Sequence, residues 1–312
     1  MTNFNSEKSQ LPSTVGATVG ADELPSYQQL HMEQDLKQTF TQLILDHQEI
    51  QRLFSSVSAT LANTPHVGAG HDLYIVWDCL WKRHDAAHRA SQRNASKCAQ
   101  ILEDYTSVLV PLSKANMDVE KKAKVINIFM EDLPVYEESA RNLSTEFRDL
   151  AKLVEIFPAT LSSYLAGVQG VWERLWSGLG SIFQSVWSAL SSLARTFQNL
   201  LSCIGRICVS APCLGVTVRL SSTRNTSPQN YSVTHQVPVA DGATVLTERL
   251  AGFEDAWHLV SLKCDNLLQS VKMAGKLSAI PKVSNAVLKN AEMIHLPLQE
   301  CLSAYANGKA PL

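Results

Sequence analysis

The sequence predicts an all-α fold, an elongated antiparallel bundle of about five long helices. The first observation is that apolar residues recur in alternating steps of four and three over five long stretches. The second is that short segments rich in turn residues separate most of these stretches. A set of shorter, broken helices in an ordinary all-α domain is the alternative reading.

Composition limits the classes of function. Of the 312 residues, 45% are apolar and only 18% are charged, against roughly 25% charged in a typical soluble chain. The 27 basic and 29 acidic residues nearly cancel, so we expect no nucleic-acid partner. The 7 cysteines are odd in number and form no CxxC pair, which indicates reduced thiols.

Both ends of the chain are expected to be tails outside the bundle. Residues 1–26 are rich in small and polar residues without an apolar run, so we expect a disordered tail and no signal peptide. Residues 307–312 form a short C-terminal tail. The protein is therefore expected to be cytoplasmic as made, and to associate with membranes when active.

Residues 27–157 are expected to form three helices, the first part of the bundle. The residues from 63 to 70 form a turn between the first two helices, and Pro111 ends the second. Asp118 is a candidate cap for the third helix, and Pro134 should kink or split that helix. We call the residues that recur in steps of four and three on one face of a predicted helix its stripe. The stripe of the first helix consists of Leu36, Phe40, Leu43, His47, Ile50, Phe54, Val57 and Leu61. The second consists of Leu73, Trp77, Leu80, His84, Ala87, Ser91, Asn94, Cys98, Ile101, Tyr105 and Val108.

Residues 246–306 are expected to form the last two helices of the bundle. The first of them carries the stripe Leu246, Leu250, Phe253, Trp257, Val260, Cys264, Leu267, Val271 and Ala274. The second carries Val287, Ala291, Ile294, Leu298, Cys301 and Tyr305. Both stripes keep the helical spacing of the earlier three.

The segment 158–245 differs from the rest of the chain and is predicted to be a membrane-active insert. Residues 175–194 contain no charge over 20 positions, a helical length of roughly 30 Å, which matches the hydrocarbon thickness of a bilayer. Small uncharged side chains occupy the face where a surface helix usually carries Glu and Lys. The same pattern also suits a buried helix at the centre of a bundle.

If this segment inserts, its two faces have different roles. The residues expected to enter the membrane are Trp172, Leu175, Trp176, Leu179, Ile182, Phe183, Val186, Trp187, Leu190 and Leu193. Those expected to line a pore or a contact between helices are Ser181, Ser185, Ser188 and Ser192. Tryptophan favours the membrane interface, so the three tryptophans would anchor the segment.

Two further features follow this stretch. Cys203, Cys208 and Cys213 lie at its end and are candidates for lipidation, or alternatively small buried hydrophobic residues. Residues 215–239 contain two β-like runs around a turn-rich segment, which predicts either a small hairpin or an irregular loop.

Long helices that bracket such a segment resemble, in layout, the α-helical pore-forming toxins of the cytolysin A and haemolysin BL type. The resemblance covers about residues 30–306. It implies a soluble bundle that releases an apolar hairpin at a membrane and then oligomerises. In this chain the insert is longer and richer in serine than a simple apolar tongue.

No pattern in the sequence predicts catalysis. The run from His84 to His88 resembles the zinc-binding HExxH helix, but Asp85 replaces the glutamate and no third ligand follows. A polar layer in the bundle is the other reading of these residues. We therefore expect a non-enzymatic protein without a cofactor, a metal site or an evident small-molecule substrate.

The expected function is perforation of a lipid bilayer by residues 164–213, with several copies of the chain associating on the membrane. The alternative is a coiled-coil interaction protein that the same segment anchors to a membrane or a partner. Dye release from vesicles separates the two, since only the first predicts leakage.

Overall fold

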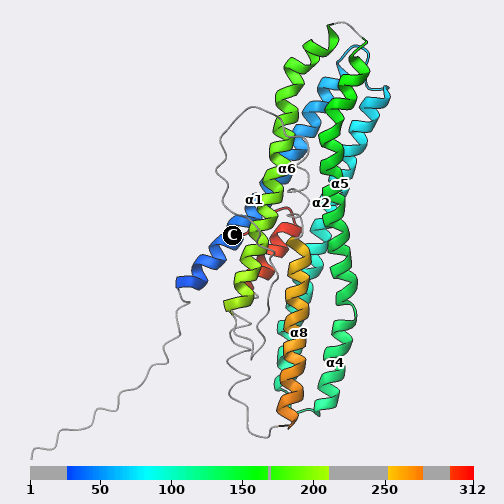
Figure 1. Cartoon of the computed structure of the whole chain (residues 1–312). Helices are drawn as coiled ribbons and strands as arrows, with labels where there is room; N and C mark the ends of the chain where they lie inside the picture. The colour runs from blue at the N-terminus through cyan, green and yellow to red at the C-terminus, as the bar shows by residue number, and fades with distance from the viewer. Residues whose placement is uncertain (1–26, 168–169, 211–251, 277–295) are drawn as a thin grey trace, which may run out of the picture.

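The computed structural model describes residues 27–167, 170–210, 252–276 and 296–312 (Figure 1). These residues are mostly helical and contain no strand, which confirms the all-α bundle. The main helices are α1 (Tyr27–Ala62), α2 (Asp72–Asp104), α4 (Val119–Glu131), α5 (Leu133–Leu165), α6 (Val171–Ser210) and α8 (Gly252–Lys276). A C-terminal helix spans residues 296–306.

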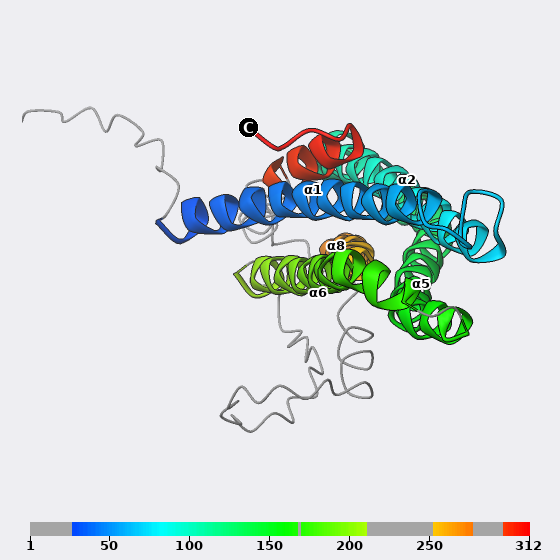
Figure 2. The ribbon, with the colours of Figure 1, turned by 90° about the horizontal axis from the view of Figure 1, so that it is seen from above.

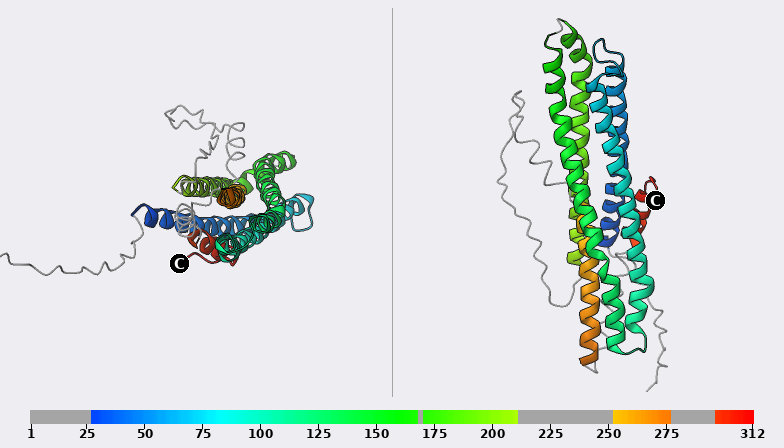
Figure 3. Two further views of the ribbon diagram at one scale, coloured as in Figure 1. Left: turned by 90° about the horizontal axis from the view of Figure 1, so that it is seen from below. Right: turned by 90° about the vertical axis from the view of Figure 1, so that its right-hand side faces the viewer.

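The bundle is elongated, and different sets of helices form its two halves. In one half α1 packs against α6 and α2, and α5 packs against α2 and α6. In the other half α8 packs against α4 and α5, and it also contacts α2 and α6 (Figure 3, right). The helices α2 and α5 therefore contribute to both halves. Seen from above, the C-terminal helix lies beside α1 and α2 (Figure 2).

The predicted stripes of α1 and α2 form the core. All eight members of the first stripe are buried, as are those of the second from Leu73 to Tyr105. The second stripe fails only at Val108, which is exposed, whereas Leu109 is buried. The reason is a π-helical turn, η1 (Tyr105–Leu109), which precedes the short helix α3 (Val110–Lys114). Its wider turn shifts the buried face by one residue.

The third predicted helix is divided into α4 and α5. Asp118 caps α4 as expected, since its side chain accepts hydrogen bonds from the backbone N–H groups of Glu120 and Lys121. Pro134 lies in the first turn of α5, where proline needs no hydrogen-bond partner for its nitrogen. The helix α5 then continues through Pro158 to Leu165, beyond the end at residue 157 that the stripe predicted.

Several predictions lie outside the described residues. They are the disordered tail 1–26, the hairpin or loop at 215–239 and Cys213. The first turn of the fourth predicted helix and most of the fifth also lie outside. The parts of these two helices that are described, α8 and the C-terminal helix, bury their predicted stripes at Trp257, Val260, Cys264, Leu267, Val271, Leu298, Cys301 and Tyr305.

One buried hydrogen bond fixes α8 to α2. The Trp257 indole N–H donates to Asn94 Oδ1 at 2.6 Å, and both side chains are buried. We expect Asn94→Ala to lower the free energy of unfolding by about 1–3 kcal/mol, because it leaves the indole N–H without its acceptor. Denaturant unfolding measures this loss. In a Trp257→Phe background, which has no indole N–H, the same substitution should lose less. An equal loss in both backgrounds would contradict the role of this bond.

Candidate functional site

The apolar face of α6 is packed inside the bundle. Leu175, Leu179, Phe183, Val186, Leu190 and Leu193 are all buried. Ile182 and Trp187 are half-buried, and Trp176 is the member of the predicted inserting set that is clearly exposed, at 40%. The helix position of Trp172 is described, but its side chain is not. In this conformation the face expected to meet lipid therefore contacts protein.

The serine face of α6 points away from this core. Ser181, Ser185 and Ser188 are exposed, while Ser192 is half-buried. Ser185 donates its hydroxyl proton to the backbone carbonyl of Ser181 at 2.9 Å, which satisfies the hydroxyl within the helix. These small side chains leave the exposed face of α6 between Ser181 and Ser188 without a charge.

A buried carboxylate connects α1 to α6. Asp46 of α1 accepts hydrogen bonds from the hydroxyl groups of Ser192, at 3.0 Å, and Thr196, at 2.7 Å. Gln42 donates to the same carboxylate at 2.9 Å. In the described part of the chain no Lys or Arg forms an ion pair with Asp46. Hydroxyl groups of α6 therefore supply two of the hydrogen bonds to this carboxylate.

A second polar contact joins the same two helices further along. Thr39 Oγ1 of α1 lies 3.9 Å from Cys203 Sγ of α6, and both residues are buried. Cys203 is thus a small buried side chain in the interface, as the alternative reading expected. The side chain of Cys208 is not described.

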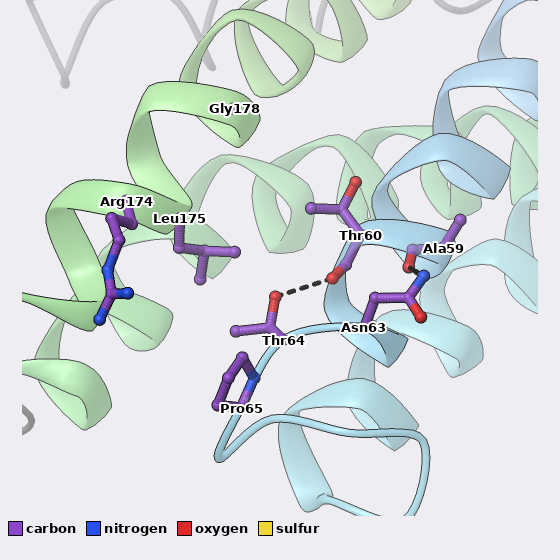
Figure 4. Close-up of a pocket in the computed structure, with 8 residues that line it drawn as sticks. All are labelled: Ala59, Thr60, Asn63, Thr64, Pro65, Arg174, Leu175 and Gly178. Carbon is purple, nitrogen blue, oxygen red and sulfur yellow. Dashed lines mark hydrogen bonds between the residues drawn. The ribbon is translucent and has the colours of Figure 1, made fainter.

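A groove opens between the end of α1 and the start of α6 (Figure 4). Its volume is about 520 Å³, and it is lined by Ala59, Thr60, Asn63, Thr64, Pro65, Arg174, Leu175 and Gly178. Two of these side chains form hydrogen bonds with backbone carbonyls in the last turn of α1. Asn63 Nδ2 donates to Ala59 O at 2.8 Å, and Thr64 Oγ1 donates to Thr60 O at 2.7 Å. Apart from Arg174, the lining carries no charge.

The groove belongs to an end of the molecule that is nearly free of charge. The connections α1–α2 and α5–α6 both lie at this end (Figure 1). Residues 53–71 and 156–172 contain no Asp, Glu, Lys or Arg. Exposed apolar side chains of α2, α5 and α6 occur in the same region: Ile75, Val76, Ile156, Tyr164 and Trp176.

A cluster of three histidines lies in the core where α1 meets α2. His47 Nδ1 of α1 lies 3.4 Å from His84 Nε2 of α2, and both rings are fully buried. The ring of His88 stacks on that of His47 with 3.9 Å between centroids. Tyr305 of the C-terminal helix completes the group, since its hydroxyl lies 3.2 Å from His47 Nε2.

The direction of the hydrogen bonds in this cluster follows from the single proton of each hydroxyl. Ser91 donates to the His88 carbonyl at 2.6 Å and therefore accepts from Tyr305 OH, also at 2.6 Å. Tyr305 then accepts from His47 Nε2–H, which leaves Nδ1 of His47 to accept from His84 Nε2–H. The chain ends at His84 Nδ1, a buried nitrogen without a hydrogen-bond partner in the described structure.

Burial favours the neutral form of these rings. Desolvation lowers the pKa of His47 well below its ordinary value, and the two neighbouring histidines lower it further. Desolvation, with a smaller effect of His88, lowers the pKa of His84 to about 3. Burial also lowers the pKa of His88, where Asp85 acts against the shift and Arg89 adds to it. Each ring is thus neutral at pH 7.

Within the described residues no group of three or more His, Cys, Asp or Glu side chains is arranged to hold a metal ion. Over the same residues no helix combines the length and the apolar character needed to cross a membrane. The described thiols of Cys98, Cys264 and Cys301 are buried, and burial raises the pKa of each to about 12.

The chain matches no protein family, no curated protein and no solved structure.

Sequence reasoning found part of this site. It placed His84 and His88 on one face of a helix, and it placed His47 and Tyr305 in two other stripes. The signal for the cluster was the presence of polar residues at core positions in three separate stripes. The stripes alone do not show that these residues contact each other in the folded chain. Asp46 lies outside every stripe and was missed, since only its partners on α6 explain its burial.

Proposed function

We propose that the protein acts on lipid bilayers without catalysing a reaction, by transferring α6 and the adjoining end of α5 from the bundle into the membrane. The observation that carries this proposal is the uncharged end of the bundle. Exposed Tyr164 and Trp176 occur there beside two connections without a formal charge. Aromatic side chains of this kind favour the membrane interface, whereas charged residues resist entry.

The construction of α6 supports the same proposal. Its apolar face is available to lipid once the helix leaves α1, and residues 175–194 carry no charge that would oppose the transfer. Its serine face offers small side chains through which several copies can approach each other closely. Copies of α6 associating through this face would form the oligomer on the membrane.

A second candidate function is that of a helical interaction protein held to a membrane or partner by the same end. The burial of Val186, Leu190 and Leu193 against protein favours it, because these side chains need no lipid in this conformation. This candidate predicts binding to vesicles or to a partner without leakage of their contents.

A reversible cross-link between α1 and α6 tests the first candidate. Thr39→Cys places a second sulfur beside Cys203, at a position where the native oxygen lies 3.9 Å from Sγ. We expect the oxidised variant to leave phosphatidylcholine vesicles loaded with calcein intact, because α6 cannot leave α1. Reduction of the same sample should restore leakage to the level of the native chain.

The controls separate the cross-link from the substitution. Oxidised native protein shows whether its own thiols form bonds, and Thr39→Ser removes the methyl group without adding a thiol. Leakage that is equal in the oxidised and reduced variant would contradict movement of α6. Vesicle binding without leakage in every sample would favour the interaction protein.

A further inference from the structure

The histidine cluster lies where most of the helices around α6 meet. His47 contributes from α1, His84 and His88 from α2, and Tyr305 from the C-terminal helix. Phe147 of α5 packs against the ring of His47 with 5.7 Å between centroids. Phe197 of α6 contacts Phe147 in turn, at 6.1 Å. The cluster is therefore connected to α6 through Phe147 and Phe197.

Few charged groups face the cluster. On α2 these are Asp85 and Arg89, which form an ion pair with each other next to His88. Gln51 of α1 also donates to Asp85, at 3.5 Å. Ser91, also on α2, is uncharged, and so are Phe147 of α5 and Tyr305 of the C-terminal helix, which the cluster meets on the other packed elements. The described surroundings therefore provide no carboxylate in contact with His47 or His84 that would accept an added proton.

We propose that His47, His84 and His88 form an acid-sensitive latch, whose protonation opens the bundle and exposes the apolar face of α6. A proton added to the hydrogen-bonded chain must go to His84 Nδ1, which is buried and has no acceptor nearby. Further protonation would place two positive rings 3.4 Å apart at their nearest nitrogens. The opening itself does not depend on the proposed function. Only the later entry of the exposed α6 face into a membrane rests on it.

The pH dependence of unfolding tests the latch in the absence of lipid. A histidine that stays neutral in the folded chain but is charged in the unfolded chain raises the unfolding constant about tenfold for each pH unit below 6.5. Stability is therefore complete above that pH and is lost as the pH falls. For the fully buried His47 and His84 together we expect about a hundredfold rise per pH unit, measured by denaturant titration between pH 6.5 and 5.0.

Two substitutions identify the cluster as the source. His84→Gln should reduce the rise to about tenfold per pH unit, because one titrating ring is removed. His258→Gln, at an exposed position of α8, is the matched control and should leave the pH dependence unchanged. If His84→Gln does not fold, His88→Gln at the half-buried edge of the cluster replaces it and should also reduce the rise, because burial lowers the pKa of His88 as well. A rise below tenfold in the native chain, or one that the cluster variants do not reduce, overturns the latch.

Opening and membrane activity are then measured separately at pH 7.5 and 5.0. An apolar dye that binds the acidified protein, while circular dichroism shows retained helix, supports exposure of the α6 face. Acid-induced dye binding without calcein release from phosphatidylcholine vesicles supports the latch and contradicts the proposed membrane function. Vesicle leakage that is equal at both pH values, with no acid-induced dye binding, overturns the latch and leaves the membrane function standing.

Discussion

Val186→Glu is expected to prevent folding of the bundle. Val186 is 0% exposed in the middle of α6, where the new carboxyl group would find no partner among the apolar side chains. Keeping that group protonated at pH 7 costs about 4 kcal/mol, because its ordinary pKa is about 4.3. Fitting the longer side chain costs roughly a further 1–3 kcal/mol. Together these costs rival the 5–15 kcal/mol that typically stabilises a folded chain.

Circular dichroism and thermal melting measure this effect directly. Ser188→Glu is the matched control, because it places the same carboxylate two residues away on the exposed face of α6. It should melt close to the native chain, since substitutions on exposed surfaces usually change stability by about 0.5 kcal/mol or less. A Val186→Glu protein that melts like this control would show that the apolar face of α6 is not core.

Trp77→Ala is expected to produce the second largest loss of stability. The fully buried indole stands where four helices meet, with ring centroids 4.7 Å from Phe54, 4.9 Å from Phe157 and 5.5 Å from Phe183. Its N–H also donates to the carbonyl of Phe54 at 3.1 Å. Truncating a buried aromatic side chain typically costs about 3–5 kcal/mol, since neighbours close the cavity only in part.

Denaturant unfolding compares this variant with Trp176→Ala. Trp176 belongs to α6 and is 40% exposed, so its truncation should cost clearly less than that of the fully buried Trp77. Both variants lose one tryptophan, which makes their fluorescence signals comparable. Equal losses in the two variants would contradict the assignment of Trp77 to the junction of α1, α2, α5 and α6.

Helical spacing was enough to predict the fold class and most of the core. The stripe of α1 is buried from Leu36 to Leu61 without exception, because a straight helix keeps its apolar positions on one face. The stripe of α2 lost its register at Val108, since the π-helical turn depends on local packing that spacing does not encode. Pro158 did not end α5, although a proline inside a helix usually interrupts it.

The candidate site was less predictable, because its main contacts join residues far apart in the chain. In the sequence nothing distinguishes Ser192 and Thr196 from the other polar residues of α6. Only the structure shows that both donate hydrogen bonds to Asp46 of α1. The apolar face of α6 suited lipid or protein equally well, and spacing alone could not decide between the two. The structure describes the conformation in which protein covers it; the transfer to lipid stays a prediction.

The position of Tyr305 has a consequence for biosynthesis. Its hydroxyl contacts His47, which precedes it by 258 residues, so this part of the core closes only after residue 305 has left the ribosome. The helices α1, α2, α5 and α6 emerge well before it and can pair with each other first, since domains generally assemble as their segments are synthesised. During that interval Ser91 and His47 lack a partner that they have in the finished bundle. The helix at residues 296–306 is thus the last of the described helices to join this core during synthesis.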